Sequence, residues 1–206
     1  MSNQYLTSSY LNKRRWISYW YQIQEISSLQ GVHSILEIGP GNKIVADTFC
    51  KMGYYVKTLD QDPQTQPDFV ADIRNKQRFP KEDFDLILCC QVLEHLPFSN
   101  FVPILKNLYA LTQKYLLLSL PYTSYGTFKP FLHVHLLPFL KPISWAAIFN
   151  LFPRSHIFNS QHCWEIGKKG YSLKKIFKDI EQGGFKIVKK YPIPENPYHY
   201  MIVCKK

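Results

Sequence analysis

The stretch Ile35-Leu36-Glu37-Ile38-Gly39-Pro40-Gly41-Asn42-Lys43 decides the fold of this chain. Its first half is short, apolar and rich in β-branched residues, which predicts a buried strand. The glycines predict a tight turn, after which a helix is expected to begin near Asn42. Gly39 and Gly41 let the backbone approach a ligand where a Cβ would collide. Together the strand, turn and helix predict a site for a nucleotide-type cofactor.

A second strand-like run, Tyr54 to Leu59, ends at Asp60. This acid lies about 20 residues after the turn, where an acid reaches the cofactor ribose in dinucleotide-binding folds. A dinucleotide fingerprint also needs a third glycine at position 44, where this chain has Ile44. Glu37 precedes the glycines, where its charge would repel a diphosphate. The turn is therefore predicted to bind a cationic or hydroxyl-rich cofactor.

This pattern of acids and glycines resembles the class I S-adenosylmethionine-dependent methyltransferases of the small-molecule type. The first motif and the acid after the second strand are carried by Glu37, Gly39, Gly41 and Asp60. Lys43 stands where many members of that family have a third glycine. The resemblance spans about residues 31–121 by motif and 184–206 by pattern. Its further strand-like runs are Asp68 to Ile73, Phe84 to Leu96 and Lys114 to Leu120.

The resemblance implies an α/β fold with a Rossmann-like, mostly parallel seven-stranded sheet. The implied strand order is 3-2-1-4-5-7-6, with the last strand antiparallel and helices on both faces. Independently, the alternation of predicted helices and strands through residue 121 favours a mostly parallel sheet. Ligands of such sheets lie outside the carboxyl ends of the strands. The polar residues Glu37, Asp60, Asp72 and Gln91 all stand at predicted strand ends.

The resemblance also implies a cofactor, S-adenosyl-L-methionine, with S-adenosyl-L-homocysteine as its product. The glycine turn would lie beside the methionine part, and Asp60 would accept both ribose hydroxyls. Asp72 would contact adenine, although Asp72 could instead cap a helix and Asp60 could instead form a turn. The implied cofactor-binding residues are Glu37, Gly39, Pro40, Gly41, Asp60, Asp72, Ile73 and Gln91.

Three side chains are candidates for catalysis, because a hydroxyl acceptor would benefit from a general base. His162 is predicted to be this base or an acceptor contact, and Glu165 is predicted to orient it. In the alternative interpretation, His162 and Trp164 only pack against the rest of the domain. His95 follows the fourth strand and either takes part in catalysis or braces the start of a helix.

No metal site is predicted. His133 and His135 would share one face of an extended strand, as metal ligands can, but the sequence offers no evident third ligand. The 5 cysteines are an odd number without Cys-x-x-Cys spacing, which argues against a disulfide framework and a zinc finger. The N-terminus has no apolar signal core, and no apolar run reaches the length of a membrane span. These features predict a cytoplasmic protein.

The length of 206 residues predicts a single methyltransferase domain, residues 1–206. An N-terminal helical segment is expected at residues 1–30, and an insertion rich in aromatic residues and proline, expected to cap the site, at residues 122–170. The N-terminal helix is predicted to pack its apolar side on the domain rather than on a membrane. That side comprises Trp16, Tyr19, Trp20, Ile23 and Ile26.

The hydrophobic middle of the insertion predicts a small-molecule acceptor, or a lipid- or saccharide-linked one. It also predicts a peripheral contact with a membrane through residues 128–152. The net charge of +10 keeps a nucleic-acid methyltransferase open as an alternative. The run Cys90-Gln91-Val92-Leu93 lacks the Pro-Pro motif of nucleic-acid amino methyltransferases, so nucleic acid is not the expected partner. A binding or scaffold protein with the same fold and no turnover is the other alternative.

Overall fold

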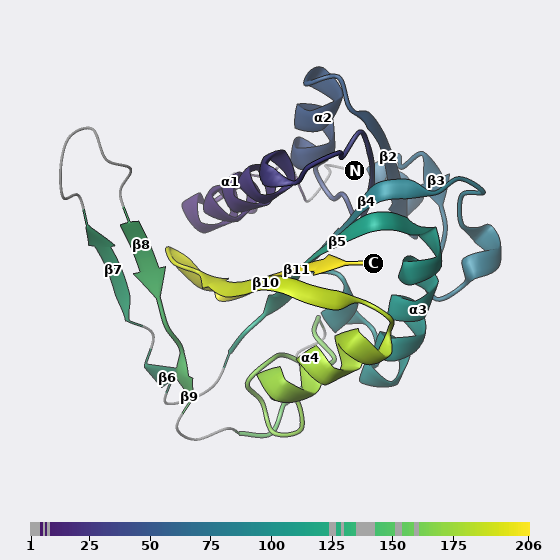
Figure 1. Cartoon of the computed structure of the whole chain (residues 1–206). Helices are drawn as coiled ribbons and strands as arrows, with labels where there is room; N and C mark the ends of the chain where they lie inside the picture. The colour runs from purple at the N-terminus through teal and green to yellow at the C-terminus, as the bar shows by residue number, and fades with distance from the viewer. Residues whose placement is uncertain are drawn as a thin grey trace.

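The structure is a computed structural model that describes residues 5, 7, 9–123, 127–128, 130–134, 143–150, 154–158 and 161–206. Figure 1 shows a central twisted sheet with helices against it and a hairpin that extends to one side. The helices are α1 (Lys13–Ser28), α2 (Ile44–Lys51), α3 (Phe101–Leu111) and α4 (Leu173–Gln182). The strands of the central sheet are β1 (Ser34–Ile38), β2 (Tyr55–Asp60), β3 (Phe69–Val70), β4 (Phe84–Cys90), β5 (Thr112–Pro121), β10 (Lys186–Ile193) and β11 (Asn196–Lys205).

The central sheet has the order β10-β11-β5-β4-β1-β2-β3. When its seven strands are numbered along the chain, this order is 3-2-1-4-5-7-6. The pairings β1 to β2, β1 to β4, β2 to β3 and β4 to β5 are parallel, and β11 runs antiparallel to β5 and β10. The predicted α/β, Rossmann-like class is confirmed.

Two hydrophobic clusters lie on the two faces of the sheet, because successive side chains of a strand point to opposite faces. One cluster joins alternate residues of β1 and β4 to the apolar sides of α3 and α4. The other joins the residues between them to α1 and α2. Leu36 and Ile87 belong to the first cluster, and Ile35 and Leu86 to the second. Helices therefore cover both faces, as predicted.

Helix α1 lies where the sequence places it, but its buried side differs from the prediction. Its buried residues are Ser18, Gln22, Glu25 and Ile26, whereas Trp16 and Trp20 are 49% and 54% exposed. The helix buries this polar side because Glu25 accepts hydrogen bonds from Lys189 and Tyr191 of β10 at 2.5 Å. The expectation that both tryptophans face the domain was wrong.

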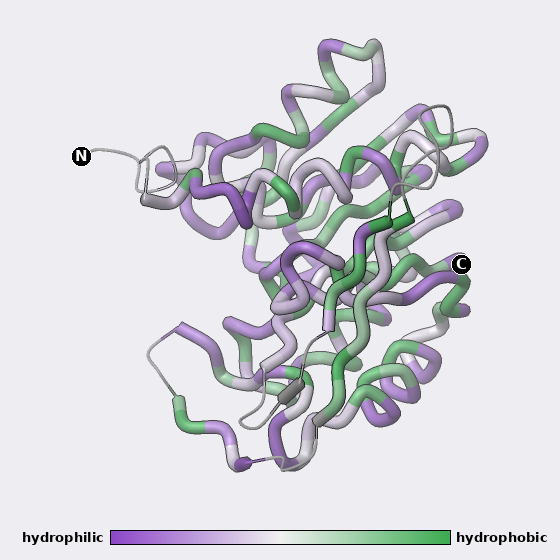
Figure 2. The backbone as a smooth tube through the Cα atoms, turned by 90° about the vertical axis from the view of Figure 1, so that its left-hand side faces the viewer, coloured by the Kyte–Doolittle hydropathy of each residue, from purple (hydrophilic) through white to green (hydrophobic). Residues whose placement is uncertain are grey.

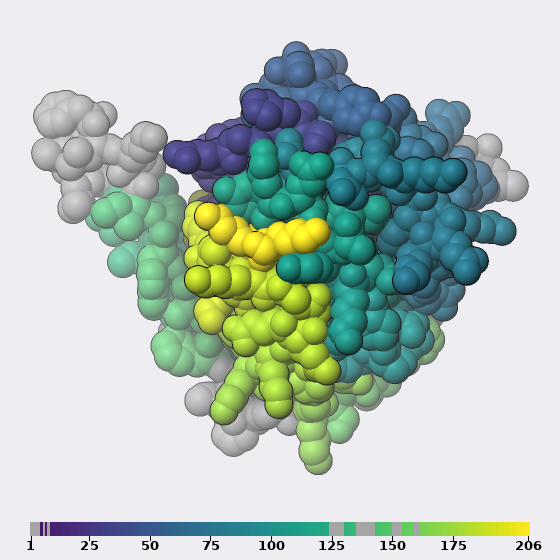
Figure 3. Space-filling view, turned by 45° about the vertical axis from the view of Figure 1, so that its right-hand side comes forward, coloured from purple at the N-terminus to yellow at the C-terminus, as the bar shows by residue number. Residues whose placement is uncertain are grey.

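Residues 122–170 add two small antiparallel sheets outside the central one. The strands β6 (Thr127–Phe128) and β9 (Phe149–Asn150) pair, as do β7 (Phe131–Val134) and β8 (Ile143–Ala146). Figure 3 shows the green residues of this region projecting from the side of the molecule. Residues 135–142, which include His135 and most of the hydrophobic middle, lie outside the described residues. The division of the chain into one domain and a cap stays a prediction.

Hydrophobic and hydrophilic stretches alternate along the chain trace in Figure 2. Within the described part of the chain, no helix combines the length and the apolar character that crossing a bilayer requires. Helix α4 has a capped N-terminus, because the Ser172 side chain accepts a hydrogen bond from the Lys175 N–H, and Gly183 is its C-cap.

Candidate active site

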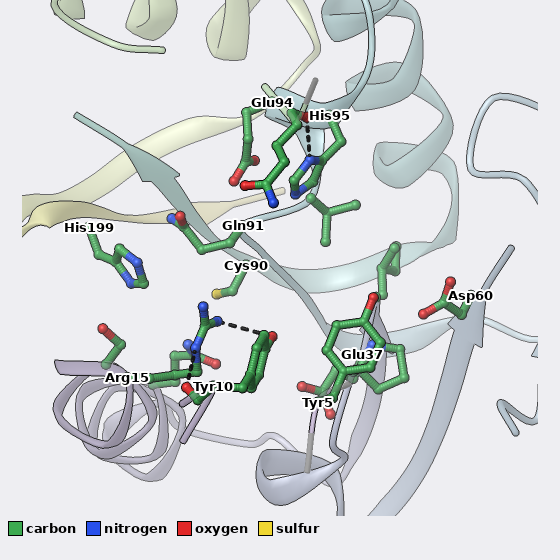
Figure 4. A pocket seen from close by; sticks show the side chains of 18 of the residues that line it. Tyr5, Tyr10, Arg15, Glu37, Asp60, Cys90, Gln91, Glu94, His95 and His199 are labelled. Atoms are coloured by element: carbon green, nitrogen blue, oxygen red, sulfur yellow. Dashed lines mark hydrogen bonds between the residues drawn. The ribbon is translucent and has the colours of Figure 1, made fainter. Parts of the chain in front are cut away.

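A cavity of about 1010 Å³ lies at the carboxyl ends of β1, β2 and β4, and helix α1 borders it (Figure 4). Its position follows from the parallel sheet, whose strand ends and following turns meet at one edge. The structure brings nine of the predicted site residues to its lining. These are Glu37, Gly39, Pro40, Gly41, Asp60, Ile73, Gln91, His95 and His162.

The turn after β1 requires glycine at position 39. Gly39 has a φ of +66°, and a Cβ there would meet Cγ2 of Val92 at 2.6 Å. The Gly39 N–H donates to the Leu59 carbonyl at 2.9 Å, which ties the turn to β2. The backbone is therefore held open to the cavity at a place where a side chain does not fit.

Lys43 has a left-handed backbone with a φ of 57° and directly precedes helix α2. This conformation is easily adopted by glycine, which explains why a glycine is suited to this position. Lys43 keeps the path of the turn, and its ammonium group donates to the Gln66 carbonyl. The predicted turn is thus retained without the third glycine.

Glu37 is buried beside the turn and supports the helix that follows. Its Oε2 accepts a hydrogen bond from the Ala46 N–H of α2 at 3.0 Å. Burial raises the pKa of Glu37 to about 8, which favours the protonated carboxyl at neutral pH. This contact ties the end of β1 to the helix that follows the turn.

The two acids predicted to contact ribose and adenine lie differently. Asp60 lines the cavity, and its Oδ1 accepts a hydrogen bond from the Asp62 N–H at 3.0 Å. Asp72 is not among the lining residues, although its neighbours Ala71 and Ile73 are. The Asp72 carboxylate pairs with Arg74 at 2.5 Å and also accepts the Arg74 N–H, and these bonds lower the pKa of Asp72.

The sequence analysis missed Arg15 as a site residue. Of the described residues that line the cavity, Arg15 alone is an arginine or lysine. Its guanidinium lies 3.8 Å from the centre of the Tyr10 ring and donates to the Tyr10 hydroxyl and carbonyl at 3.0 and 3.1 Å. A signal was present in the sequence, because Arg15, Ser18, Tyr19 and Gln22 follow helical spacing and all line the cavity.

The opposite side of the cavity is assembled from two segments that are far apart in the sequence. Residues 161–164 lie against the short 3-10 turn Leu93–His95 and Leu96. The Cys163 N–H donates to the Glu94 carbonyl at 2.7 Å, and the Trp164 indole N–H donates to the Leu96 carbonyl at 3.1 Å. Nδ1 of His95 bonds the Gln161 carbonyl at 2.7 Å. These bonds place His95 and His162 with their ring centres 5.0 Å apart.

His162 lies beside the carboxylate of Glu165, the residue predicted to orient it. Its Nδ1 lies 2.8 Å from Oε1 of Glu165, and the Tyr198 hydroxyl lies 3.3 Å from both atoms. Burial acts against ionisation of Glu165, but the hydrogen bond and charge of His162 outweigh it and lower the pKa of Glu165. Glu165 itself is not among the lining residues, whereas His162 is.

Two further polar residues on this side were not predicted as site residues. Glu94 is fully buried, lines the cavity and has a pKa that burial raises to about 8. His199 also lines the cavity, and burial together with the charge of Arg15 lowers its pKa to about 3.

Gln91 joins the two sides of the cavity. It follows β4 with a φ of 56°, a left-handed conformation that costs free energy for a residue with a side chain. Its Nε2 donates to the Ser119 hydroxyl of β5 at 2.9 Å, and its N–H donates to the Ser119 carbonyl at 2.8 Å. These bonds hold the strained residue in the cavity lining.

Known proteins share this fold. A glycopeptide N-methyltransferase, MtfA, in complex with S-adenosyl-L-homocysteine, superposes with a TM-score of 0.59 at 11% identity, over 89% of this chain and 88% of that chain. A methyltransferase from Clostridium acetobutylicum gives 0.56 at 12% identity, over 98% and 94%. The 1,6-didemethyltoxoflavin-N1-methyltransferase of Burkholderia thailandensis gives 0.55 at 13% identity, over 93% and 85%. No curated protein sequence matches the chain.

A family profile described as "Methyltransferase domain" matches residues 36–115, the span from β1 into β5. The matched span includes the glycine turn, Asp60 and Gln91, and the remaining strands complete the seven-stranded order of that fold. Over this part of its length the chain is similar to a methyltransferase domain, and its fold is that of the S-adenosylmethionine-dependent methyltransferases of known structure.

Proposed function

We propose that this protein transfers a methyl group from S-adenosylmethionine to a small-molecule acceptor. The observation that carries this proposal is the cavity in which the glycine turn, Asp60 and Arg15 meet. These groups match a ligand that bears a ribose diol and an amino-acid carboxylate. Asp60 would accept the ribose hydroxyls, Arg15 would hold the carboxylate, and the apolar Ile73 would contact adenine. When bound, the cofactor supplies an electrophilic methyl group on a sulfonium.

The acceptor is proposed to lie on the side of His162. The Nδ1–H of His162 points to Glu165, which leaves Nε2 with a lone pair in the neutral ring. A histidine held in this way serves as a base or a contact for an acceptor group. Positioning and the exclusion of water would supply the rest of the rate.

Calorimetric titration with S-adenosylmethionine, followed by a labelled-methyl screen on a cell extract, tests the proposal. We expect one cofactor to bind per chain and at least one small-molecule product to carry label. No binding to the folded protein would contradict the proposal, and binding without any labelled product would favour a scaffold. In His162→Ala, turnover should fall while the cofactor still binds. Unchanged turnover would remove His162 from the mechanism.

The hairpin of β7 and β8 supports an amphipathic acceptor or a peripheral membrane contact. Phe131, Leu132, Ile143 and Trp145 of these strands are each about half exposed. Exposed apolar surface of this kind marks interaction sites. We therefore propose that the protein is cytoplasmic and binds membrane surfaces peripherally through this hairpin.

Vesicle co-sedimentation tests this contact. Ile143→Ser/Trp145→Ser should reduce binding to anionic vesicles, whereas Val70→Ser, which removes an equally exposed residue from β3, should not. Equal binding of both variants and the wild type would place the contact elsewhere.

A further inference from the structure

We propose that Glu94, His95 and His162 form a binding site for a divalent transition-metal ion. One donor atom from each of these residues lies within 4.8 Å of the others. Two imidazoles and one carboxylate form a recognised ligand set for Fe²⁺, Mn²⁺, Co²⁺ or Zn²⁺. Donors on one ion are at most about 4.2 Å apart when each bond is about 2.1 Å, so the side chains need only small movements.

Glu94 provides the first independent observation. Its side chain is fully buried at the cavity, and neither carboxylate oxygen has a hydrogen-bond partner on another described residue. A buried carboxyl without partners is costly, because it has lost its bonds to water and gained none. A cation bound to these oxygens would remove that cost.

The hydrogen bonds of the two histidines provide the second observation. Nδ1 of His95 faces the Gln161 carbonyl, and Nδ1 of His162 faces the Glu165 carboxylate. Both partners only accept, so each Nδ1 donates its proton to them, and the neutral His162 ring then has its lone pair on Nε2; the Gln91 backbone also bonds the His95 ring. Metal-binding histidines are held in the same manner, with one ring nitrogen on the metal and the other donating to a carbonyl or carboxylate.

The site faces the cavity, since Glu94, His95 and His162 all line it. Three protein ligands leave at least one coordination position open to an incoming molecule. If the proposed methyl transfer is correct, the ion would bind an oxygen of the acceptor and hold it near the glycine turn. His162 would then be an acceptor-site residue through the ion, and its Nε2 would not serve as a base.

Titration of the cofactor-free protein with Co²⁺ tests the site, monitored by visible absorption and by calorimetry. We expect one ion per chain and an absorption band from a nitrogen- and oxygen-bound Co²⁺. Glu94→Gln and His162→Ala should each weaken binding at least tenfold. Glu165→Gln, which alters only the partner of His162, should weaken it by about tenfold. His133→Ala removes an exposed histidine of β7 and should bind Co²⁺ as the wild type does.

Thermal unfolding of each variant separates loss of the site from loss of the fold. If His162→Ala is unfolded, Co²⁺ binding by the conservative Glu94→Gln and Glu165→Gln variants still tests the site. No binding of Co²⁺, Mn²⁺ or Zn²⁺ to the wild type would overturn the proposal. Binding that is unchanged in Glu94→Gln and His162→Ala would also overturn it, because the ion would lie elsewhere. Neither result depends on whether the protein binds S-adenosylmethionine.

Discussion

The two sides of the cavity are built in different ways. The side of the glycine turn comes from one continuous stretch, β1 to Asp60, and its backbone does most of the shaping. The opposite side joins the turn at Leu93–His95 to residues 161–165 and to Tyr198 and His199, and its side chains do the shaping. The first side is fixed by local conformation, and the second depends on contacts across the fold.

Replacing Glu37 by Gln should give the largest effect, through the pH dependence of stability. The pKa of Glu37 is about 8 in the folded chain and about 4.5 when unfolded. Unfolding between these values releases a proton, so the wild type loses stability as the pH rises. The loss is about 1.4 kcal/mol per pH unit, or on the order of 4 kcal/mol from pH 5 to 8.

Gln at position 37 keeps an acceptor for the Ala46 N–H but does not ionise. Urea unfolding at pH 5, 6.5 and 8 measures the difference in the free energy of unfolding between the two proteins. The difference should grow in favour of Glu37→Gln as the pH rises. A constant difference across this range would show that Glu37 is not held in its protonated form.

Gly39→Ala should weaken the binding of S-adenosylmethionine by about 100-fold, or roughly 2.7 kcal/mol. The added Cβ would meet Val92 at 2.6 Å on a backbone with positive φ. Gly53→Ala is the matched control, because its φ is +88° but nothing lies within 4 Å of the added Cβ. Calorimetry should find wild-type affinity in the control. If Gly39→Ala binds S-adenosylmethionine with wild-type affinity, the backbone of the glycine turn does not shape that side of the cavity as described.

Asp60→Asn should weaken cofactor binding by about tenfold, because hydrogen bonds to a charged acceptor contribute roughly 1.5–3 kcal/mol and the amide retains part of that. The variant keeps an oxygen for the Asp62 N–H, so the local turn should persist. Asp62→Asn, which changes the next acid along the chain, serves as the control. Equal affinities of the two variants would remove Asp60 from the ribose site.

Lys43→Gly should have the smallest effect, a gain in stability of up to about 1 kcal/mol. Glycine relieves the left-handed backbone at position 43 but adds entropy to the unfolded chain, which offsets part of the gain. Chemical denaturation measures this change. A clear loss of stability would mean that the bond from the Lys43 ammonium group to Gln66 contributes more than the backbone strain costs.

The same contrast explains what the sequence could predict. The strands and the glycine turn follow from local patterns, whereas the strand order was implied only by the resemblance to a known family. Gly39 and Asp60 could be identified by their spacing. The exposed tryptophans of α1 were misjudged because the helix packs Glu25 against Lys189 and Tyr191, a pairing that spacing does not reveal. Glu94 was missed because its surroundings come from segments that meet only in the folded chain, whereas the helical spacing of Arg15 with Ser18, Tyr19 and Gln22 was visible in the sequence.

Titration of the wild-type chain with S-adenosylhomocysteine, with NAD as a comparison, tests the central claim most directly. Ile44 in place of a third glycine opposes a dinucleotide, while Asp60 and Arg15 suit a nucleoside that carries an amino-acid group. The account predicts binding of one S-adenosylhomocysteine per chain and no detectable binding of NAD. A folded protein that binds NAD equally well, or that binds neither compound, would contradict it.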